Sequence, residues 1–370
     1  MLQLRGLPVV PDPRPRRRAR LLESLAPLKV DAMLVSHLPN VRYLSGFTGS
    51  NALLLVSPKK SVLYTDPRYD FQAAVECDCS VKVMTGSTWT DALKDIARKR
   101  YSRLALEAAR VSHQQWMDAS SVLGKTVKLA GVGAVADRLR MVKSGEEIDL
   151  IRRSVKLASK VYEKAIRKVK PETTEVGLAA EIDFQMRKLG ASGPSFPTIV
   201  AAGERSALPH AQPMNESVGR DRLLLVDMGA CLDGYASDMT RMAHLGRPTQ
   251  QAADLHAAVL EAQLAAIGAI RAGVAASKVD EAARRSLKKR KLDKAFMHST
   301  GHGLGLEIHE GPRIGRTSED TLEAGMVITI EPGAYIEGFG GVRIEDTIVV
   351  TETGAEILTP TAKELLVLEQ

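Results

Sequence analysis

The sequence predicts an α/β domain followed by an α+β domain, and three observations lead to this fold class. Short apolar runs alternate with helical patterns through the first third of the chain, a capped amphipathic helix begins near residue 144, and helix pairs followed by strand runs fill the rest. A length of 370 residues fits two domains, or three small ones. We place a basic tail at residues 1–15, the first domain at 16–135 and the second at 140–370.

In the first domain, five short apolar or β-branched runs predict strands, and amphipathic stretches between them predict helices. The predicted strands are Ala32–Ser36, Ala52–Val56, Ser61–Thr65, Val81–Met84 and Arg103–Glu107. The predicted helices are Arg16–Leu28, Asp91–Arg100 and Ser112–Leu123. After them, we expect a domain boundary near residues 131–144, where the glycines of Gly131-Val132-Gly133 indicate a flexible segment.

The second domain opens with Ser144-Gly145-Glu146-Glu147, a capping-box pattern at the start of a helix that Pro171 ends. Further helices are predicted near residues 174–190, 249–272 and 277–292, the last opening at Ser277. The predicted strands are Ile199–Ala202, Leu223–Met228, Ala236–His244, Met326–Glu331 and Val342–Thr351. Because a helix pair followed by strands occurs twice, we expect two similar halves.

Composition indicates a cytoplasmic globular protein. Apolar residues make up 44% of the chain and charged residues 26%, and no window approaches the roughly 18 apolar residues of a membrane span. The first residues lack the pattern of a secretory signal. Three cysteines, an odd number with one close pair, do not make a disulfide framework. We therefore expect a cytoplasmic protein that does not bind membranes.

The net charge of +7 is concentrated at the start of the chain. Residues 1–20 hold six arginines and one aspartate, which is +5, so the other 350 residues carry only +2. A second basic run, Lys288-Lys289-Arg290-Lys291, lies at the end of a predicted helix, where cations favour the helix dipole. No basic stripe is interleaved with aromatic residues, which argues against nucleic-acid binding.

Three acids lie in runs that otherwise predict buried strands. Asp227 ends Leu223–Val226, Glu331 ends Val327–Ile330, and Glu345 lies inside the strand predicted from Val342. An ionised carboxylate is costly to bury unless a counter-charge or a metal meets it. Three such acids in core-like strands therefore predict a site rather than accidents of sequence.

A predicted hairpin brings a second acid next to Asp227. Asp233-Gly234 is a strong hairpin-turn signal, and a turn there pairs Leu232 with Tyr235. Asp227 then faces Thr240, and Asp238, two residues before Thr240, lies on the same face of the sheet. The hairpin thus directs two carboxylates at one point.

His302 is the fifth candidate, within the glycine-rich run from His298 to Gly305. His298 and His302 are four apart, as in a zinc-binding HExxH helix, but no glutamate follows His298 and Gly301 disfavours a helix. We therefore reject the HExxH interpretation. The glycines instead allow the backbone to turn closely around the imidazole.

Charge predicts how many ions this cluster binds. Asp227, Asp238, Glu331 and Glu345 carry four negative charges, which two divalent cations would neutralise. Carboxylate oxygens with one imidazole suit Mn²⁺, Co²⁺, Fe²⁺ or Zn²⁺. Two such ions, about 3.5–4 Å apart, can bridge a water and lower its pKa to make a nucleophilic hydroxide. The alternative is that the acids pair with Arg241, Arg343 and the histidines.

These residues resemble the pita-bread metallopeptidases, which include Xaa-Pro aminopeptidases, Xaa-Pro dipeptidases and methionine aminopeptidases. The resemblance rests on Asp227-Met228-Gly229 with Gly234–Arg241, on His298–Gly305 with His309, on Glu331–Tyr335, on Gly341–Asp346, and on Ser195–Val200 with Ala207–His210. Upstream, Asn40–Phe47 resembles the creatinase-like amino-terminal domain of the proline-specific members. The resemblance covers nearly the whole chain after about residue 16 and implies a pita-bread catalytic domain with pseudo-twofold halves.

The resemblance also implies a role for each site residue. Asp227 would bind one ion, His302 and Glu331 the other, and Asp238 and Glu345 would bridge both. Glu331 would also carry the proton from the bridging water to the leaving nitrogen. His210 and His309 would hold the substrate and stabilise the developing oxyanion. The residues expected to shape the proline pocket are His298, Tyr335 and Arg343.

We therefore expect a Xaa-Pro aminopeptidase that uses two divalent ions, with Mn²⁺ preferred and Co²⁺ or Zn²⁺ as alternatives, and that forms a homodimer. Creatinase-like members lack this ligand set, and methionine aminopeptidases normally lack the preceding domain. A Xaa-Pro dipeptidase is the alternative enzyme, and an inactive pita-bread binding module is the alternative of another class. A strict dipeptidase needs a cation for the free carboxylate, and the connection from Ala334 to Gly341 contains no arginine. That absence favours the aminopeptidase.

Overall fold

The computed structural model describes residues 13–99, 101–124 and 126–369. The chain separates into two compact units, residues 1–140 and 141–370, each described here by itself. The expected basic tail lies outside the described residues up to residue 12, and the first helix already begins at Pro13. Within the described part, no helix has the length and apolarity needed to cross a bilayer.

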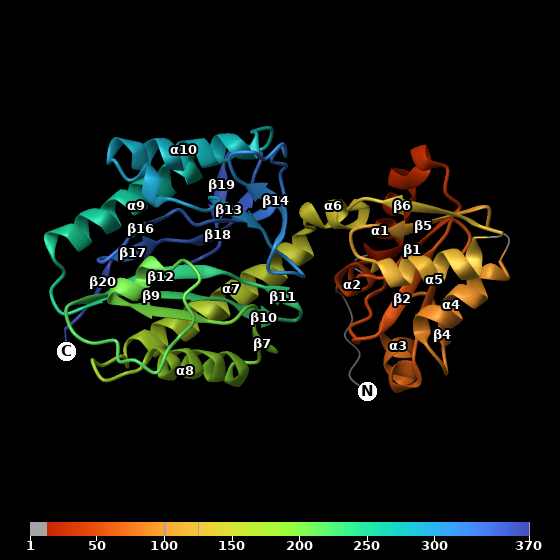
Figure 1. Ribbon diagram of the computed structural model, residues 1–370, viewed down its shortest axis with the longest axis horizontal. Helices are drawn as coiled ribbons and strands as arrows, with labels where there is room; N and C mark the ends of the chain where they lie inside the picture. Colours follow the sequence, from red (N-terminus) through yellow and green to blue (C-terminus); the bar gives the residue numbers. More distant parts are fainter. Residues whose placement is uncertain (1–12, 100, 125, 370) are drawn as a thin grey trace, which may run out of the picture. The chain divides into compact units, whose positions relative to one another are not determined.

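The first unit is built on a six-stranded sheet in the order β4-β3-β2-β1-β5-β6 (Figure 1). The pairings of β1 with β5, β5 with β6 and β3 with β4 are parallel, and those of β1 with β2 and β2 with β3 are antiparallel. The strands are β1 (Ala32–Val35), β2 (Ala52–Val56), β3 (Val62–Thr65), β4 (Ser80–Val83), β5 (Arg103–Glu107) and β6 (Lys128–Val132). The helices are α1 (Pro13–Leu25), α2 (Leu38–Ser45), α3 (Asp70–Glu76), α4 (Thr88–Ala97), α5 (His113–Leu123) and α6 (Val135–Met141). The last residue of α6 already belongs to the second unit.

The five strands predicted for this unit are confirmed, but the prediction of a flexible segment at Gly131–Gly133 is wrong. Gly131 and Val132 end β6, which pairs with β5 at the edge of the sheet. A glycine is tolerated there because the Trp116 ring and the Ala108 side chain pack against it. The sequence also gave no signal for α2, α3 and α6, which are only seven or eight residues long.

The arginines near the start of the chain stabilise the carboxyl end of α2. Arg14, Arg17 and Arg18 donate to the carbonyls of Ser45, Tyr43 and Leu44, at 3.1, 3.1 and 2.7 Å. The last carbonyls of a helix lack partners inside it and carry its negative dipole end, so three cations suit that place. Much of the basic segment is thus explained by the fold of the first unit.

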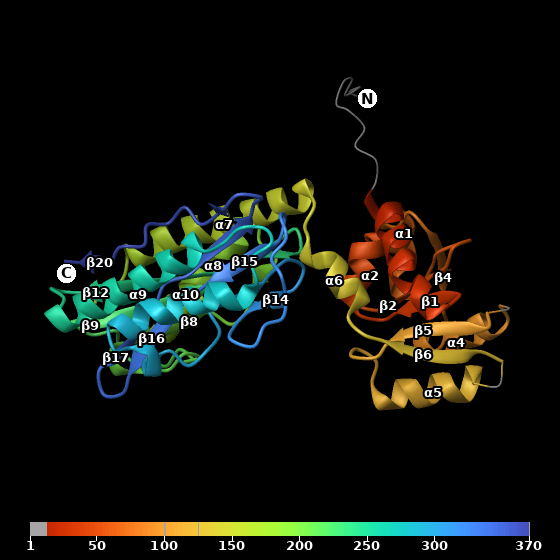
Figure 2. The same ribbon diagram turned by 90° about the horizontal axis from the view of Figure 1, so that it is seen from above.

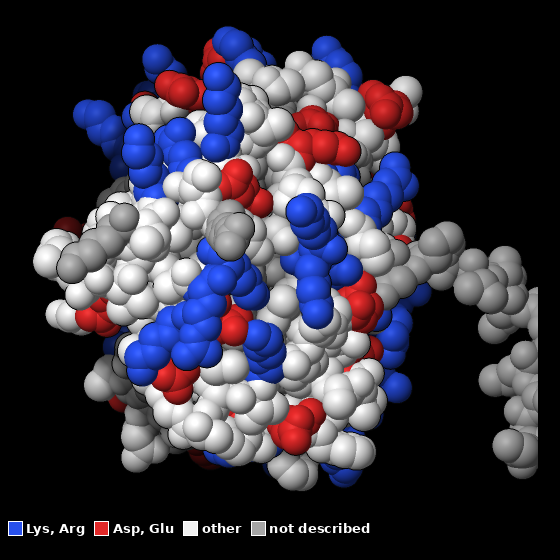
Figure 3. All heavy atoms as spheres, turned by 90° about the vertical axis from the view of Figure 1, so that its right-hand side faces the viewer, with Lys and Arg blue, Asp and Glu red and all other residues white. Residues whose placement is uncertain are grey.

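Figure 3 shows one face of the first unit, on which basic side chains outnumber acidic ones but the two are interspersed. Ion pairs of this unit include Lys82 with Asp95 at 2.5 Å and Lys94 with Asp91 at 3.1 Å. Paired and exposed charges of this kind contribute little to stability, about 0–1 kcal/mol each. They keep the surface polar and mixed in sign.

The second unit places helices on both sides of its strands (Figures 1 and 2). The helices are α7 (Gly145–Ile166), α8 (Glu175–Lys188), α9 (Gln250–Gly268) and α10 (Ala276–Lys289). The sheets have the strand orders β11-β10-β7, β20-β12-β9-β8, β14-β13-β15-β18-β19 and β16-β17. Two arrays of a helix pair with strands, α7-α8 with β8, β9 and β12 and α9-α10 with β13, β15 and β18, form the two expected halves.

The strands of this unit have the following bounds. The first half holds β7 (Gly193–Pro194), β8 (Ile199–Ala202), β9 (Arg222–Met228), β10 (Ala230–Leu232), β11 (Tyr235–Ala236) and β12 (Met239–Leu245). The second half holds β13 (Gly301–Gly303), β14 (Glu310–Ile314), β15 (Val327–Ile330), β16 (Gly333–Ile336), β17 (Gly340–Arg343), β18 (Asp346–Val350) and β19 (Ala355–Ile357). The last strand, β20 (Leu366–Leu368), returns to the first half and pairs with β12.

Strand β9 is apolar on both faces because both faces are covered. Leu224 and Val226 pack in the core with α7 and α8, whereas Leu223 and Leu225 pack in the core with α9 and α10. Successive strand residues point to opposite faces, so a strand between two helix layers has no polar side. Asp227 continues the face of Leu223 and Leu225, which puts its carboxylate inside the protein.

The predicted helices of this unit are confirmed, but the start predicted for the last of them at Ser277 is wrong. Ser144 accepts from the N–H of Glu147, whose side chain accepts in return from Ser144, so the predicted capping box is confirmed. By contrast, α10 begins at Ala276 without a side-chain cap, and Ser277 lies inside it. Asp280 is instead buried, where it accepts hydrogen bonds from Arg284 and Thr300.

The strand predicted from Val342 to Thr351 is interrupted. Strand β17 ends at Arg343 and pairs with β16, whereas β18 begins at Asp346 and pairs with β15 in a different sheet. Glu345 therefore lies in the step between two sheets and not inside a strand as expected. Its backbone N–H donates to the Thr240 carbonyl of β12 at 3.2 Å, which ties this step to the other half.

Candidate metal centre

Five residues predicted to bind metal converge from both halves of the second unit. Asp227 lies on β9 and Asp238 directly precedes β12, in the hairpin of the first half. The second half supplies His302 from the middle of β13, Glu331 directly after β15, and Glu345 directly before β18. All five line one cavity of about 670 Å³.

The hairpin register is the one predicted. Leu232 pairs with Tyr235 and Asp227 with Thr240. Across the cavity, the His302 Nε2 atom lies 3.6 Å from an Asp238 oxygen and 3.5 Å from a Glu331 oxygen. One ligand atom each of Asp238, His302 and Glu345 lies within 4.8 Å of the other two. These spacings let several donors reach one ion.

The carboxylates of this cluster have oxygens that no protein group satisfies. Asp227, Asp238 and Glu345 are 8%, 5% and 1% exposed, and one buried oxygen of each has no hydrogen-bond partner among the described residues. A buried polar atom without a partner costs about 1–3 kcal/mol, and more when it is charged. Hard oxygen donors with one imidazole are the donor set of divalent transition ions. The residues therefore fit a metal centre.

Burial and mutual repulsion disfavour the ionised forms of these acids. Burial raises the pKa of Asp238 and of Glu345 well above the usual range, and neighbouring carboxylates raise both further. Burial likewise raises the pKa of Glu331 to about 8, although Arg343 opposes the rise. Burial lowers the pKa of His302 to about 4, so its imidazole is neutral and able to bind a metal.

Arg343 is the cation inside the cluster. Its guanidinium donates to the Asp227 Oδ2 atom at 2.5 Å, to the Tyr335 hydroxyl at 2.8 Å and to the Thr240 hydroxyl at 3.1 Å. The alternative prediction, acids neutralised by arginines, therefore holds for one oxygen of Asp227. Arg241 instead pairs with Asp346 at 2.7 Å, so among the described residues only the Arg343 guanidinium pairs with a carboxylate of the cluster.

His302 is held in a fixed orientation by its own backbone and by close glycines. Its Nδ1 atom lies 3.0 Å from the Gly303 carbonyl, which leaves Nε2 for the carboxylates. A Cβ on Gly301 would lie 1.9 Å from the Thr329 carbonyl oxygen, and one on Gly303 would lie 2.0 Å from that of Gly311. Only glycine permits these strands to approach, so the glycines belong to the site.

The residues predicted to bind substrate lie around the same cavity, with one difference. His210, His298, His309 and Arg343 line it, and the rings of His302 and His309 lie edge to face with centroids 4.4 Å apart. Tyr335 does not line the cavity. Its hydroxyl lies 2.8 Å from the His298 Nε2 atom, so it connects His298 with Arg343 from behind.

A buried ion pair anchors the loop that carries His210. Glu175, 1% exposed, accepts hydrogen bonds from the N–H groups of Ala202 and Met214, at 2.9 Å each, and from the Arg205 guanidinium. These contacts fix both ends of the loop. Local sequence pattern does not reveal this role of Glu175, because it depends on backbone groups distant along the chain.

Two further features of the cavity had no role assigned from the sequence: Arg313, and the apolar wall formed by Phe196, Pro197 and Ile199, which lies in the Ser195–Val200 motif. Arg313 lies on β14 directly opposite His302 of β13, and its exposed side chain lines the cavity. Arg313 lies outside the connection from Ala334 to Gly341, the segment in which the sequence lacks an arginine. The signal for it was its position four residues after His309, in the strand that begins at Glu310.

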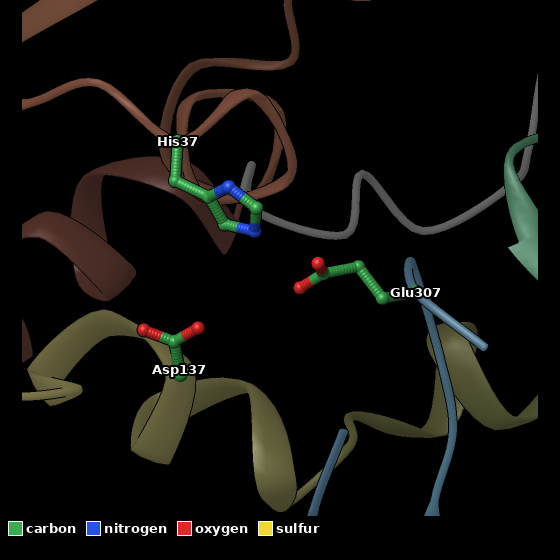
Figure 4. A group of neighbouring side chains, drawn as sticks. All are labelled: His37, Asp137 and Glu307. Atoms are coloured by element: carbon green, nitrogen blue, oxygen red, sulfur yellow. The ribbon is translucent and has the colours of Figure 1, made fainter. Parts of the chain in front are cut away.

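Figure 4 shows a second group of titratable side chains, of which His37 and Asp137 belong to the first unit. Asp137 accepts hydrogen bonds from Arg110 at 2.6 Å and from Asn40 at 3.3 Å. Although burial acts to raise it, the pKa of Asp137 is lowered overall by Arg110. Glu307 belongs to the second unit, where its N–H donates to Glu310. We assign no metal site to this group.

Comparisons with known proteins agree with this geometry. Residues 149–352 match the model of metallopeptidase family M24, and residues 17–142 match that of the creatinase/prolidase N-terminal domain. The chain belongs to the M24 metallopeptidase family. The predicted creatinase-like domain and pita-bread catalytic domain are thereby confirmed.

Relatives of this M24 metallopeptidase are similar over nearly their whole length. A Xaa-Pro dipeptidase of Pyrococcus furiosus is 35% identical over 354 residues, which cover 95% of this chain and 99% of the relative. The structure of a Xaa-Pro dipeptidase from Bacillus anthracis has a TM-score of 0.93 at 32% identity, covering 96% of this chain and all of that one. An X-Pro aminopeptidase from Thermotoga maritima has a TM-score of 0.88 at 35% identity, covering 95% and 99%.

Proposed function

We propose that this M24 metallopeptidase hydrolyses Xaa-Pro dipeptides with the help of two divalent ions. The observation that carries the proposal is the convergence, in one cavity, of the five candidate ligands with Arg343 and the exposed Arg313. Arg313 supplies the cation that a dipeptidase needs for the free carboxylate of proline. The aminopeptidase prediction depended on the absence of such an arginine, so its main argument no longer applies.

The ligand roles implied by the family suit these positions. Asp227 would bind one ion, His302 and Glu331 the other, and Asp238 and Glu345 both. The clustering of Asp238, His302 and Glu345 ligand atoms supports the last assignment. Ions bound there would activate a water molecule as the nucleophile. They would also neutralise the carboxylates that Arg343 leaves uncompensated.

The remaining steps belong to side chains of this chain. Glu331, whose side chain is 17% exposed, would take the proton of the attacking water and deliver it to the proline nitrogen. His210 and His309 would donate hydrogen bonds to the oxygen that gains negative charge on the scissile carbonyl. Burial lowers the pKa of His298 to about 4, which keeps its imidazole neutral. A neutral side chain can line the pocket for the apolar proline ring.

A proline-specific pocket has a physical reason. The proline nitrogen carries no hydrogen and its ring fixes φ, so the enzyme loses a backbone donor and must recognise the ring itself. His298 and Arg343, linked from behind by the Tyr335 hydroxyl, form a wall beside the cluster. We propose that this wall contacts the proline ring.

A Xaa-Pro aminopeptidase is the second candidate. The observation that favours it is the size of the cavity, about 670 Å³, which exceeds what a dipeptide fills. The likeness to the Thermotoga maritima X-Pro aminopeptidase points the same way. An inactive binding module is disfavoured, because it would not need all five ligands.

The test compares hydrolysis of Ala-Pro, Ala-Pro-Ala-Ala and Ala-Ala by protein reconstituted with Mn²⁺. We expect the fastest turnover on Ala-Pro and little on Ala-Ala. Arg313→Gln should raise KM for Ala-Pro about tenfold or more, the loss of one charge-assisted contact. Arg285→Gln, an exposed arginine outside the cavity, is the matched control.

The outcomes separate the candidates. Faster turnover of Ala-Pro-Ala-Ala, together with an unchanged KM in Arg313→Gln, would establish the aminopeptidase instead. No hydrolysis of either proline peptide after metal loading would reject both. Metal analysis of the protein as purified tests the preference for Mn²⁺ over Co²⁺ or Zn²⁺, and sedimentation tests the proposed homodimer.

A further inference from the structure

A second cavity of about 640 Å³ adjoins the metal cavity. His298, Ser299 and Arg313 line both cavities, so the two cavities meet at these three residues. The second cavity is otherwise formed by the segment from Asp293 to Met297, by Arg284 of α10, and by Gly315, Arg316 and Thr317 after β14. We call it the basic chamber.

The basic chamber carries an excess of unneutralised positive charge. Its lining includes Arg284, Lys294, Arg313 and Arg316 against one acid, Asp293. Arg284 is already bound to Asp280, at 2.7 Å, and to the Phe296 carbonyl, at 3.0 Å. Lys294, Arg313 and Arg316 are exposed and have no acceptor among the described residues. Three cations around one hollow therefore face solvent without a partner.

The hydrolysis proposed for the metal cavity needs no cation beyond Arg343 and Arg313. It therefore does not explain the other cations of the basic chamber. A peptide that continues past proline extends by about 3.3–3.6 Å per residue, so its third residue would leave the metal cavity beside Ser299 and Arg313. The side chain and the carboxylate of that residue would then lie in the basic chamber. An acidic third residue brings two negative charges to Lys294 and Arg316.

We propose that the basic chamber binds acidic residues following proline, so that the enzyme also cleaves tripeptides of the type Xaa-Pro-Glu and Xaa-Pro-Asp. This rests on the proposed Xaa-Pro hydrolysis and extends it beyond dipeptides. The chamber selects charge and not shape, because its cations are long, exposed side chains around an open hollow. The preference therefore weakens as salt screens the charges.

The experiment compares kcat/KM for Ala-Pro-Glu and Ala-Pro-Gln, which differ in charge but hardly in size, with Ala-Pro measured alongside. In the unmodified protein the glutamate peptide should be favoured about tenfold, equivalent to about 1.4 kcal/mol. The double variant Lys294→Gln/Arg316→Gln should bring this ratio close to one. Arg285→Gln, which removes an exposed cation lining a different cavity, should leave the ratio unchanged.

A ratio near one in the unmodified protein would overturn the proposal, as would a tenfold ratio retained in the double variant. Cleavage of Ala-Pro without cleavage of either tripeptide would overturn it as well, while leaving the proposed dipeptidase intact. If Ala-Pro itself is not hydrolysed by the metal-loaded protein, the proposed function fails first. The ratio should also fall in about 0.5 M salt, where the Debye length is only a few ångströms.

Discussion

Removal of the metal ions should make the catalytic unit less stable as the pH rises from about 6.5 to about 8. Without ions, Asp227, Asp238, Glu331 and Glu345 share one cavity in which Arg343 is the buried cation, whereas Arg313 is exposed to solvent. Burial, together with repulsion between the acids, raises the pKa values of Asp238, Glu331 and Glu345. The metal-free folded state therefore keeps protons that the unfolded chain has already released.

The sign and size of the effect follow from linkage. Glu331 has an ordinary pKa of 4.5 and a folded value of about 8, so between these values the folded state binds more protons and stability falls as pH rises. Each pKa unit is about 1.4 kcal/mol, so the interval from 6.5 to 8 contributes about 2 kcal/mol from Glu331 alone. Asp238 and Glu345 act in the same direction.

The lower limit of this interval is set by histidines. Burial lowers the pKa values of His298 and His302 from 6.5 to about 4, so the unfolded state binds more protons below pH 6.5. Their contribution to stability is lost as pH falls from 6.5 toward 4, which opposes the effect of the acids. Only above pH 6.5 do the acids act alone.

The assay is urea unfolding of chelator-treated protein at about pH 6.5 and about pH 8, followed by far-ultraviolet circular dichroism. Both tryptophans, Trp89 and Trp116, lie in the first unit, so their fluorescence reports that unit and provides an internal reference. The Glu331→Gln variant should show a smaller dependence on pH. Metal-free protein that is as stable at pH 8 as at pH 6.5 would refute the reasoning.

Three further results are expected. Arg241→Leu should lower the free energy of unfolding by about 3–5 kcal/mol, because it breaks a buried pair with Asp346; a loss below about 1 kcal/mol in urea unfolding would contradict this. Glu175→Gln should reduce kcat/KM for Ala-Pro about tenfold by loosening the loop of His210, and it should have little further effect in a His210→Ala background, which a double-mutant cycle measures. Gly301→Ala should abolish metal binding, measured by calorimetry, or solubility, because its Cβ would meet the Thr329 carbonyl at 1.9 Å, whereas Gly354→Ala, with nothing within 4 Å, should be tolerated.

Features that depend on neighbours along the chain were predictable. The register that sets Asp227 opposite Thr240 follows from the Asp233-Gly234 turn and the two-residue period of strands. The capping box at Ser144 and the long amphipathic α7 depend only on local backbone groups and helical spacing. Short elements such as α2 and β6 were missed, because tertiary packing and not local pattern stabilises elements of five to eight residues.

The step at Glu345 was not predictable from its own strand pattern. The sequence from Val342 to Thr351 predicts one continuous strand, yet Arg343 pairs in one sheet and Asp346 in another. The interruption exists because Glu345 donates its N–H to Thr240 of the opposite half and accepts from the Thr240 hydroxyl at 2.8 Å. A hydrogen bond between residues more than a hundred positions apart leaves no local signature.

The sequence by itself singled out Asp227, Glu331 and Glu345, since a carboxylate placed in an apolar strand run is costly to bury and must be compensated. It also determined the hairpin that sets a second acid beside Asp227. Only the tertiary structure decided that Arg343 lies inside the cluster while Arg241 does not, that Glu175 anchors the loop of His210, and that Arg313 faces the cavity. Burial is encoded in local pattern, whereas the partner of a buried charge depends on which distant strands the fold brings together.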